Sequence, residues 1–452
     1  MQTISIPRID ASASDFAEQI TLLRQRLSPS GNIVSERGKA LTLKVFGEPL
    51  RPDQVVQRIC DDVRQQGTPA LLHYCRELDN SMLLANQLRV SPERIREAHA
   101  DATPEFLATI RRIRANIHDF QSAILHKSVV THPSPGVSLE QRYTPLDRIG
   151  ICVPGGAAAY PSTLLMTAVP AMAAGVKEIV VVAPPTVLGA YNPQVLAICY
   201  ELGIQEIYAM GGAQAVAAMA YGLPEIRGVD KIVGPGSLFV ALAKRYVYGH
   251  VDIDSIAGPS EVVLIADEST RPDFAASDIL AQAEHSPGAS ILVTWNRAVQ
   301  DAIDMALRKQ VVALERSELT LAALENFGAY ILARDESHAC ELTNLIAPEH
   351  LHIATEEPRR LLEKIRHSGA TFLGDYSPVA LGDYAAGPSH VLPTGGTARW
   401  ASGLSSNHFL RSSSVIEYSK ESLEEIGPDI ELMANFEGLT AHRNSITIRT
   451  AD

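Results

Sequence analysis

Four side chains with metal-ligand chemistry stand in the C-terminal half of the sequence. Gln282 and His285 are three residues apart near the end of a predicted helix, so they share one face of it. Asp383 lies in a predicted loop and His442 in the tail. Two imidazoles, a carboxylate and an amide oxygen suit zinc, and the lack of a thiolate favours a catalytic or exchangeable metal. Each residue alone is more typical of a solvated surface or a helix cap, and the scattered spacing does not show that the four converge.

A second chemical feature is the adjacent pair Glu349 and His350. Pro348 ends a predicted helix directly before them, and a predicted strand follows. Two bases at such a strand–loop junction can face one cleft and transfer protons there. A helix-terminal acid followed by a surface histidine is the alternative interpretation.

Three glycine turns each follow a predicted strand and precede a predicted helix. They read VPGG from Val153, MGGAQ from Met210 and GPGS from Gly234. Free N–H groups and the positive end of the dipole at a helix N-terminus can hold a pyrophosphate. None of the turns matches GxGxxG, so the Rossmann fingerprint is absent. The turns indicate either a dinucleotide site or glycines that end strands and allow close helix packing.

Strands and helices must position these groups, and they alternate regularly from about Arg148 onward. Continuous Val and Ile runs in this region are typical of strands buried on both faces by helices. A second series of the same kind begins after about Pro259. The pattern predicts an α/β fold with two tandem Rossmann-like parallel-sheet domains, a helical N-terminal unit and a small C-terminal tail.

We place the domain boundaries where the predicted pattern of helices and strands changes. Residues 1–125 form the helical unit, 126–255 a nucleotide-binding α/β domain, and 256–395 a second α/β domain with the metal and catalytic residues. The tail, 396–452, is predicted as a Ser-rich loop, one helix and a closing strand at 445–450.

Composition limits the partners and the compartment. The 452 residues carry a formal net charge of −13, which disfavours a nucleic-acid partner. Five widely spaced cysteines with no CxxC pair argue against a disulfide framework or a cysteine zinc site. The N-terminal residues lack a signal-peptide pattern, and apolar runs break before the roughly 18 residues of a membrane span. We therefore expect a cytoplasmic protein with neither a membrane nor a nucleic-acid partner.

Several segments resemble the signature segments of the histidinol dehydrogenase family. They are VPGG, GGAQA, VDKIVGPG, GPSEVVLIAD, AQAEHSPGA, APEHLHI, GDYAAGPSHVLPT and GLTAHRNSITIR. They occur in the family's order from about Arg148 to Arg449, and together they are highly specific.

The resemblance implies a reaction. Members of the family oxidise L-histidinol to L-histidine through L-histidinaldehyde, the last step of histidine biosynthesis, and reduce two NAD⁺. It implies that His350 takes the alcohol proton and that Glu349 activates water on the aldehyde. It implies one Zn²⁺ per subunit, with the ligands Gln282, His285, Asp383 and His442.

The resemblance also implies the binding residues and a homodimer with exchanged tails. Substrate contacts fall on Ser260, His390 and Glu437, and NAD contacts on Cys152, Gln214 and Ser237. Glu437 and His442 would complete the site of the other subunit.

The chain departs from the family at three positions. The family often has Tyr at Cys152, and usually has Asn at Ser237 and Ser389. Cysteine loses a stacking ring, and serine offers one hydroxyl where an amide offers two functions. These departures predict altered cofactor contacts.

Three alternatives remain open on the sequence. Ser389 beside His390 leaves room for a related zinc and NAD dehydrogenase that oxidises another amino alcohol or a diol, which a panel of alcohols would reveal. A zinc hydrolase using Glu349 would turn over without NAD. A non-catalytic binding protein would bind zinc or ligand without forming NADH.

Overall fold

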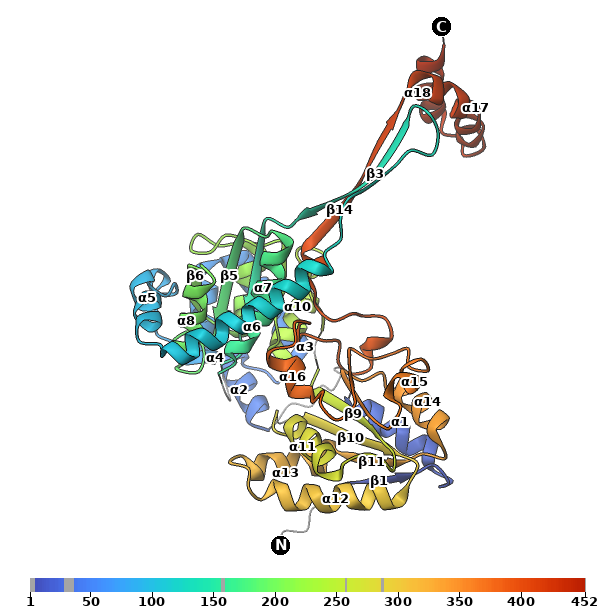
Figure 1. Ribbon diagram of the computed structural model, residues 1–452. Helices are drawn as coiled ribbons and strands as arrows, with labels where there is room; N and C mark the ends of the chain where they lie inside the picture. Colours follow the sequence, from blue (N-terminus) through green and yellow to red (C-terminus); the bar gives the residue numbers. More distant parts are fainter. Residues whose placement is uncertain (1–4, 28–35, 156–158, 257, 286–287, 452) are drawn as a thin grey trace.

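The computed structural model describes residues 5–27, 36–155, 159–256, 258–285 and 288–451. Two α/β bodies lie side by side, and a long arm leaves one of them (Figure 1). The N-terminal residues belong to the body with the six-stranded sheet. The chain then crosses to build most of the body with the five-stranded sheet and afterwards returns to the six-stranded one (Figure 1).

The first body is built around a five-stranded parallel sheet. Its order is β6 (Glu206–Ala209), β5 (Glu178–Ala183), β4 (Arg148–Cys152), β7 (Lys231–Val233) and β8 (Asp252–Ile253). The predicted helices connect these strands: α7 (Pro161–Ala174), α8 (Pro193–Glu201), α9 (Gly212–Tyr221) and α10 (Leu238–Val247). Val180 and Val182 enter one core and Val181 the other, as expected when successive strand side chains point to opposite faces.

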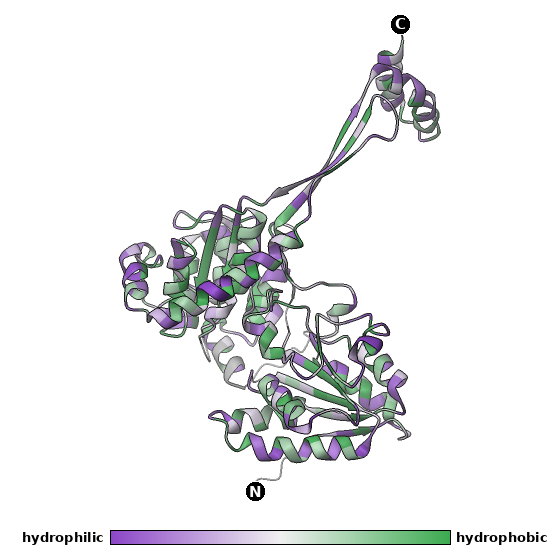
Figure 2. Ribbon diagram, in the orientation of Figure 1, coloured by the Kyte–Doolittle hydropathy of each residue, from purple (hydrophilic) through white to green (hydrophobic). Residues whose placement is uncertain are grey.

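The second body holds a six-stranded parallel sheet. Its order is β1 (Arg8–Asp10), β11 (Ala329–Leu332), β10 (Gly288–Thr294), β9 (Ser260–Ala266), β12 (His350–Ala354) and β13 (Ala370–Leu373). Its helices are α1 (Phe16–Leu27), α11 (Pro272–Ala283), α12 (Arg297–Val311), α13 (Ser317–Phe327), α14 (Glu336–Ile346), α15 (Pro358–Leu362) and α16 (Val379–Tyr384). The predicted fold class, two tandem parallel-sheet domains, is confirmed. Hydrophobic residues concentrate on the strands inside both bodies (Figure 2).

The described residues up to 125 are mostly helical, as expected from the sequence, and they pack against the two sheets. β1 pairs with β11 as an edge strand, and α1 buries Ile20, Leu23 and Leu27 in the second body. The helices α3 (Pro52–Gln66) and α4 (Thr68–Asp79) cover one face of the first sheet. The helix α6 (Pro104–Ala123), with α5 (Pro92–Ala100), lies over the other face. Each amphipathic helix therefore buries its apolar stripe against the nearest sheet.

Four shorter elements complete the described N-terminal and linking segments. They are α2 (Glu36–Phe46), η1 (Ala85–Gln87) and the pair η2 (Thr397–Arg399) and η3 (Ser406–Phe409). No helix in the described part of the chain is both long and apolar enough to cross a membrane.

The arm is a twisted antiparallel ribbon that projects away from both bodies (Figure 1). β3 (Val137–Pro145) pairs with β14 (Leu410–Tyr418) from Leu410↔Pro145 to Tyr418↔Val137, and β2 (Val129–Thr131) adds a short third strand. Two helices, α17 (Lys420–Phe436) and α18 (Thr440–Thr450), sit at its end.

Two predictions for the tail are wrong. Part of the predicted Ser-rich loop is the strand β14, whose serines pair with residues of β3. The predicted closing strand at 445–450 belongs to the helix α18, which packs on α17. There Thr447 Oγ1 donates to Glu431 Oε1 at 2.6 Å, and Ile446 lies beside Gly427. The β-branched residues favour a strand locally, but the neighbouring helix decides the outcome.

Candidate active site

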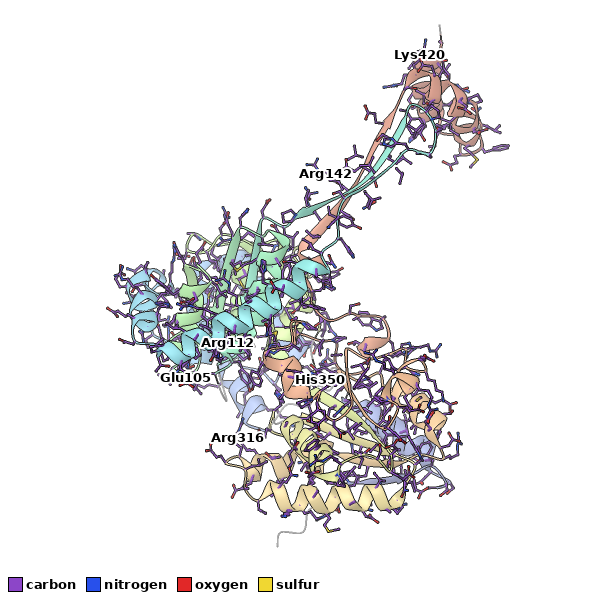
Figure 3. The ribbon with its side chains drawn as sticks, in the orientation of Figure 1. Glu105, Arg112, Arg142, Arg316, His350 and Lys420 are labelled. Carbon is purple, nitrogen blue, oxygen red and sulfur yellow. The ribbon has the colours of Figure 1, made fainter. Side chains whose placement is uncertain are left out.

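The site residues gather where the edges of the two sheets face each other. The glycine turns follow the carboxyl ends of β4, β6 and β7 in the first body, and Gly156 of the first turn lies outside the described residues. Ser260 and His350, in contrast, begin β9 and β12, so they lie at the amino edge of the second sheet. His350 lies on the side of the second body that faces the first (Figure 3). His285 lines the cavity of the glycine turns and a second cavity that Leu165 on α7 and Asp383 on α16 also line, so the two bodies share the space at this junction.

A chain of hydrogen bonds runs from the helix α11 to the strand β12. Gln282 Nε2 donates to Ser260 Oγ at 2.7 Å, and Ser260 Oγ donates to Glu349 Oε2 at 2.6 Å. Gln282 is only 1% exposed, and its Oε1 has no hydrogen-bond partner. The chain therefore fixes the orientation of the amide and leaves its carbonyl oxygen buried and free to bind a ligand.

The Glu349 carboxyl is buried, with an exposed fraction of 6%. Burial raises its pKa to about 7, although hydrogen bonds from Ser260 and from the Glu261 backbone oppose the rise. Among the described residues these two donors engage Oε2, the second at 2.9 Å. A carboxyl with a pKa near 7 can exchange a proton with bound water at neutral pH.

The His350 imidazole lies beside Glu349 and is 3% exposed. Nδ1 donates to the carbonyl oxygen of Glu261 at 3.2 Å, which leaves Nε2 as the basic nitrogen. Nε2 lies 3.7 Å from Asp383 Oδ1. Burial lowers the pKa of His350, although Asp383 opposes the shift, so the ring is held neutral and ready to accept a proton.

Asp383 and His390 enter the cleft from α16 and the loop after it. His390 Nδ1 donates to the backbone oxygen of Asp383 at 2.9 Å, which orients the free Nε2. Burial lowers the pKa of His390 to about 4, so this imidazole is neutral as well. His350 and His390 both line a cavity of about 650 Å³. Two neutral imidazoles in one cavity suit a small polar substrate.

The predicted metal ligands do not all lie together within one chain. Among the described residues, no three His, Cys, Asp or Glu side chains are close enough to hold an ion. Gln282, His285 and Asp383 lie at the cleft, whereas His442 and Glu437 are exposed on the helical tip of the arm (Figure 1). Lys420, at the start of this tip, lies at the far end of the arm from His350 (Figure 3). The structure thus brings together all but these two of the predicted metal, catalytic and substrate residues.

The donor chemistry of the cleft nevertheless fits a cation. Gln282 offers an unpaired buried oxygen. Burial raises the pKa of Asp383 and Glu349 raises it further, although the His350 imidazole opposes the rise. An amide oxygen, an imidazole and a carboxylate are suitable zinc ligands.

The glycine turns and their neighbours line a cavity of about 570 Å³ that contains Cys152, Gln214, Ser237 and His285. Gln214 Nε2 donates to Asp79 Oδ2 at 3.0 Å, and its buried Oε1 has no partner. Gly234 has φ +102°, and a side chain there would strike the carbonyl of Cys152. Close packing of two strand ends therefore requires glycine at position 234, and Gln214 presents a free buried acceptor oxygen at this cavity.

Two of the three predicted cofactor residues offer little side-chain chemistry. Cys152 is buried, and burial raises the pKa of its thiol to about 12, so it is a packing group without nucleophilic character. Ser237 is exposed at the start of α10 and makes no side-chain cap there.

A buried ion pair that we did not predict holds the third glycine turn. Lys244 Nζ lies 2.5 Å from Asp254 Oδ1 and donates to the Gly234 carbonyl at 2.9 Å. Asp254 Oδ2 accepts from the Gly234 N–H at 2.7 Å. In the sequence, Lys244 is a charged residue within a mostly apolar predicted helix, and this charge was the feature that could have indicated the buried ion pair.

Ser389 turns its hydroxyl to the backbone. Its Oγ donates to the Met166 carbonyl at 2.7 Å and accepts from the Val391 N–H at 3.2 Å. The idea that Ser389 redirects the enzyme to another alcohol gains no support from this geometry, because the hydroxyl is occupied by main-chain partners.

The fold and the cleft define an enzyme of the α/β class, with glycine turns from one parallel sheet facing a buried acid–imidazole pair from another. Comparison with known proteins narrows the class. A family model described as histidinol dehydrogenase matches residues 50–450. The histidinol dehydrogenase of Rhodopirellula baltica is 61% identical over 449 residues, which cover 99% of this chain and 98% of that protein.

Two further relatives agree. The histidinol dehydrogenase of Geobacillus kaustophilus is 47% identical over 88% of this chain and 93% of its own length. The crystal structure of histidinol dehydrogenase from Elizabethkingia anophelis matches with a TM-score of 0.88 at 32% identity and covers 99% of both chains. The chain belongs to the histidinol dehydrogenase family.

Proposed function

We propose that this protein oxidises L-histidinol to L-histidine through L-histidinaldehyde, with two NAD⁺ as hydride acceptors, as the last step of histidine biosynthesis. The observation that carries the proposal is the buried Glu349–His350 pair beside a glycine-lined cavity. An alcohol oxidation and an aldehyde oxidation each need a base, and the cleft presents two bases of different chemistry.

His350 serves the first oxidation. Its neutral ring, held through Nδ1, directs Nε2 to the substrate alcohol and accepts the hydroxyl proton as hydride leaves for NAD⁺. The surrounding protein excludes water from the imidazole and favours its neutral form.

Glu349 serves the second oxidation. Two donors hold its Oε2, so the carboxyl is fixed while it removes a proton from the water that adds to the aldehyde. The hydrate then gives up a second hydride and becomes the carboxylate. Keeping the aldehyde in the cleft between the two steps prevents loss of this reactive intermediate.

Gln282, His285 and Asp383 would hold one Zn²⁺ together with His442 of a second chain. When bound, zinc would orient the imidazole and amine of the substrate without changing its redox state. Ser260, His390 and Glu437 are the proposed substrate contacts, and Ser260 also relays the orientation of Gln282.

The NAD cavity uses backbone as much as side chains. Gln214, through its unpaired Oε1, and the N–H groups of the glycine turns are the proposed cofactor contacts, joined by Cys152 and Ser237. The five free cysteines are buried, which fits a cytoplasmic location with reduced thiols.

The arm suggests a homodimer with exchanged tips. Its strand β14 is exposed along almost its whole length, and α17 and α18 leave large apolar side chains such as Phe436 and Ile448 uncovered. A protruding ribbon with an apolar tip is suited to wrap around a second copy, which would bring Glu437 and His442 to the partner's cleft.

The test is NADH formation at 340 nm from L-histidinol, with and without prior chelation. About two NADH per histidinol, lost on chelation and restored by zinc, are expected for the four-electron reaction. The absence of NADH from a protein that carries zinc would contradict the proposal.

The variant Glu349→Gln tests whether Glu349 and His350 serve different half-reactions. We expect aldehyde oxidation to fall by about 10²- to 10⁴-fold, as for loss of a general base, and alcohol oxidation to be largely spared. Each half-reaction is measured separately, with L-histidinol or L-histidinaldehyde as substrate. Equal losses in both would refute the assignment of Glu349 to water activation.

A further inference from the structure

One buried acid beside the two bases has no part in the proposed chemistry. Glu261 is the second residue of β9, between Ser260 and the apolar run that begins at Val262, and its exposed fraction is 0%. A carboxyl removed from water in this way is costly unless hydrogen bonds hold it.

The Glu261 side chain binds the main chain of two different segments. Its Oε1 accepts from the Glu349 N–H at 3.3 Å and from the Gly395 N–H at 3.0 Å. Thr394, next to Gly395, in turn accepts from the Gly258 N–H at 2.5 Å through Oγ1. The carboxyl therefore joins the segment that enters β12 to the loop around Gly395.

The Glu261 main chain binds the two catalytic side chains. Its N–H donates to Glu349 Oε2 at 2.9 Å, and its carbonyl oxygen accepts from His350 Nδ1 at 3.2 Å. One residue thus holds the backbone of Glu349, the carboxyl of Glu349 and the ring of His350.

We propose that Glu261 is a positioning residue of the proposed dehydrogenase, whose carboxyl sets the place of the Glu349 base through its backbone while its own main chain sets the ring of His350. The inference rests on the proposed roles of Glu349 and His350. It makes the two half-reactions separable, because a side-chain substitution removes the bonds to Glu349 N and Gly395 N and leaves the main-chain bond to His350.

The experiment compares Glu261→Ala, Glu261→Gln and Glu261→Asp in both half-reactions of the zinc-loaded full chain. Misplacement of a base by about 1 Å costs up to roughly 100-fold, so we expect Glu261→Ala to lower kcat for aldehyde oxidation by about 10- to 100-fold with little change in KM. Alcohol oxidation should change much less. Faster hydrogen–deuterium exchange is expected in the segments that contain Glu349 and Gly395.

Two conservative variants test whether the position of the acceptor oxygen at residue 261 matters more than the type of group that carries it. Glu261→Gln keeps an acceptor oxygen at the same reach and should stay within about fivefold of the wild type. Glu261→Asp keeps the carboxyl group but withdraws it by one methylene, so it should be impaired like Glu261→Ala. This pair also keeps the test decisive if Glu261→Ala does not fold. Ser290→Ala, a buried change on the neighbouring strand β10, is the matched control and should affect neither half-reaction.

Three results would overturn the proposal: equal losses in both half-reactions, full activity of Glu261→Ala, or a Glu261→Gln variant as impaired as Glu261→Asp. Glu349→Gln is assayed in parallel. If it fails to impair aldehyde oxidation, the proposed role of Glu349 is wrong. If it behaves as proposed while the Glu261 variants do not, only the positioning role is wrong.

Discussion

At the scale of single residues, burial and hydrogen bonding give similar groups different chemistry. Burial raises the pKa of the Glu349 carboxyl to about 7, with donors on one of its oxygens. His350 and His390 each donate Nδ1 to a carbonyl, so each presents Nε2. The sequence shows the residue types, whereas the tautomers and the pKa directions follow from the surroundings.

His285→Asn tests the metal assignment. Even outer contacts of a metal site change affinity by about 10- to 100-fold, so loss of a direct ligand should remove bound zinc and activity together. Metal content and NADH formation are measured on the same preparations. His367→Asn is the control, because His367 Nδ1 contacts the Asn344 carbonyl and does not line the cleft, so this variant should retain its zinc. Full activity of His285→Asn at low free zinc would contradict the assignment.

At the scale of elements, the strands β9 and β12 and the helix α11 carry site residues. A buried pair of side chains connects this helix to β12. His352, two residues after His350 on β12, places Nδ1 2.7 Å from Asp278 Oδ2 on α11 and donates through Nε2 to the Gly374 carbonyl at 2.9 Å. Asp278 lies one helical turn before Gln282 on the same helix. The pair therefore connects the helix of the proposed metal ligands to the strand of the bases.

His352→Gln tests this connection through stability. Burial lowers the pKa of His352, but the hydrogen bonds to Asp278 and Gly374 outweigh it, so the folded-state pKa is raised. The stabilisation is thus fully present below the unfolded pKa and is lost as pH rises through the folded pKa. We expect His352→Gln to lower the free energy of unfolding by about 3 kcal/mol at pH about 5.5, since it leaves Asp278 buried without its partner.

The difference between wild type and His352→Gln should shrink as the pH rises. Urea unfolding at a series of pH values measures it, because the glutamine side chain of the variant does not titrate and the imidazole of the wild type does. A difference that stays constant or grows with pH would show that the imidazolium is not the stabilising form.

At the scale of the whole molecule, the arm takes two proposed site residues away from the body that holds the rest. β3 and β14 are distant in sequence but pair along nine positions, and they carry Glu437 and His442 outward. The exposed strands and the apolar tip are the basis of the proposed contact with a second copy.

Mixed dimers test the exchange of tips. His350→Ala and His442→Ala are each expected to be inactive alone. In a mixed dimer with exchanged tips, one cleft has both defects and the other has none. Random mixing gives about half mixed dimers, each with one intact site, so the mixture should recover about one quarter of wild-type activity.

The same experiment distinguishes the alternative arrangement. If each tip served its own chain, every cleft in the mixture would keep one defect and no activity would return. Size-exclusion chromatography with light scattering verifies that both variants and the mixture are dimers before activity is compared.

Local sequence patterns determined the two parallel sheets, the helices between them and the chemical types at the site. Buried Val and Ile runs mark strands wherever they occur, and glycine turns mark helix entries, so both can be read without knowing their neighbours. The Glu349–His350 pair stands out by residue type and position, whereas Gln282, His285 and Asp383 are recognised as a group only through the family resemblance, which also implies the roles of all five.

Only the tertiary structure decided how these parts face one another. It placed the carboxyl edge of the first sheet against the amino edge of the second, divided the described residues up to 125 between both bodies, and paired β3 with β14. It also made α18 a helix and brought Glu261 beside both bases. Periodicity reports which face of an element is buried, whereas its partner is set by packing between segments that are far apart in the chain.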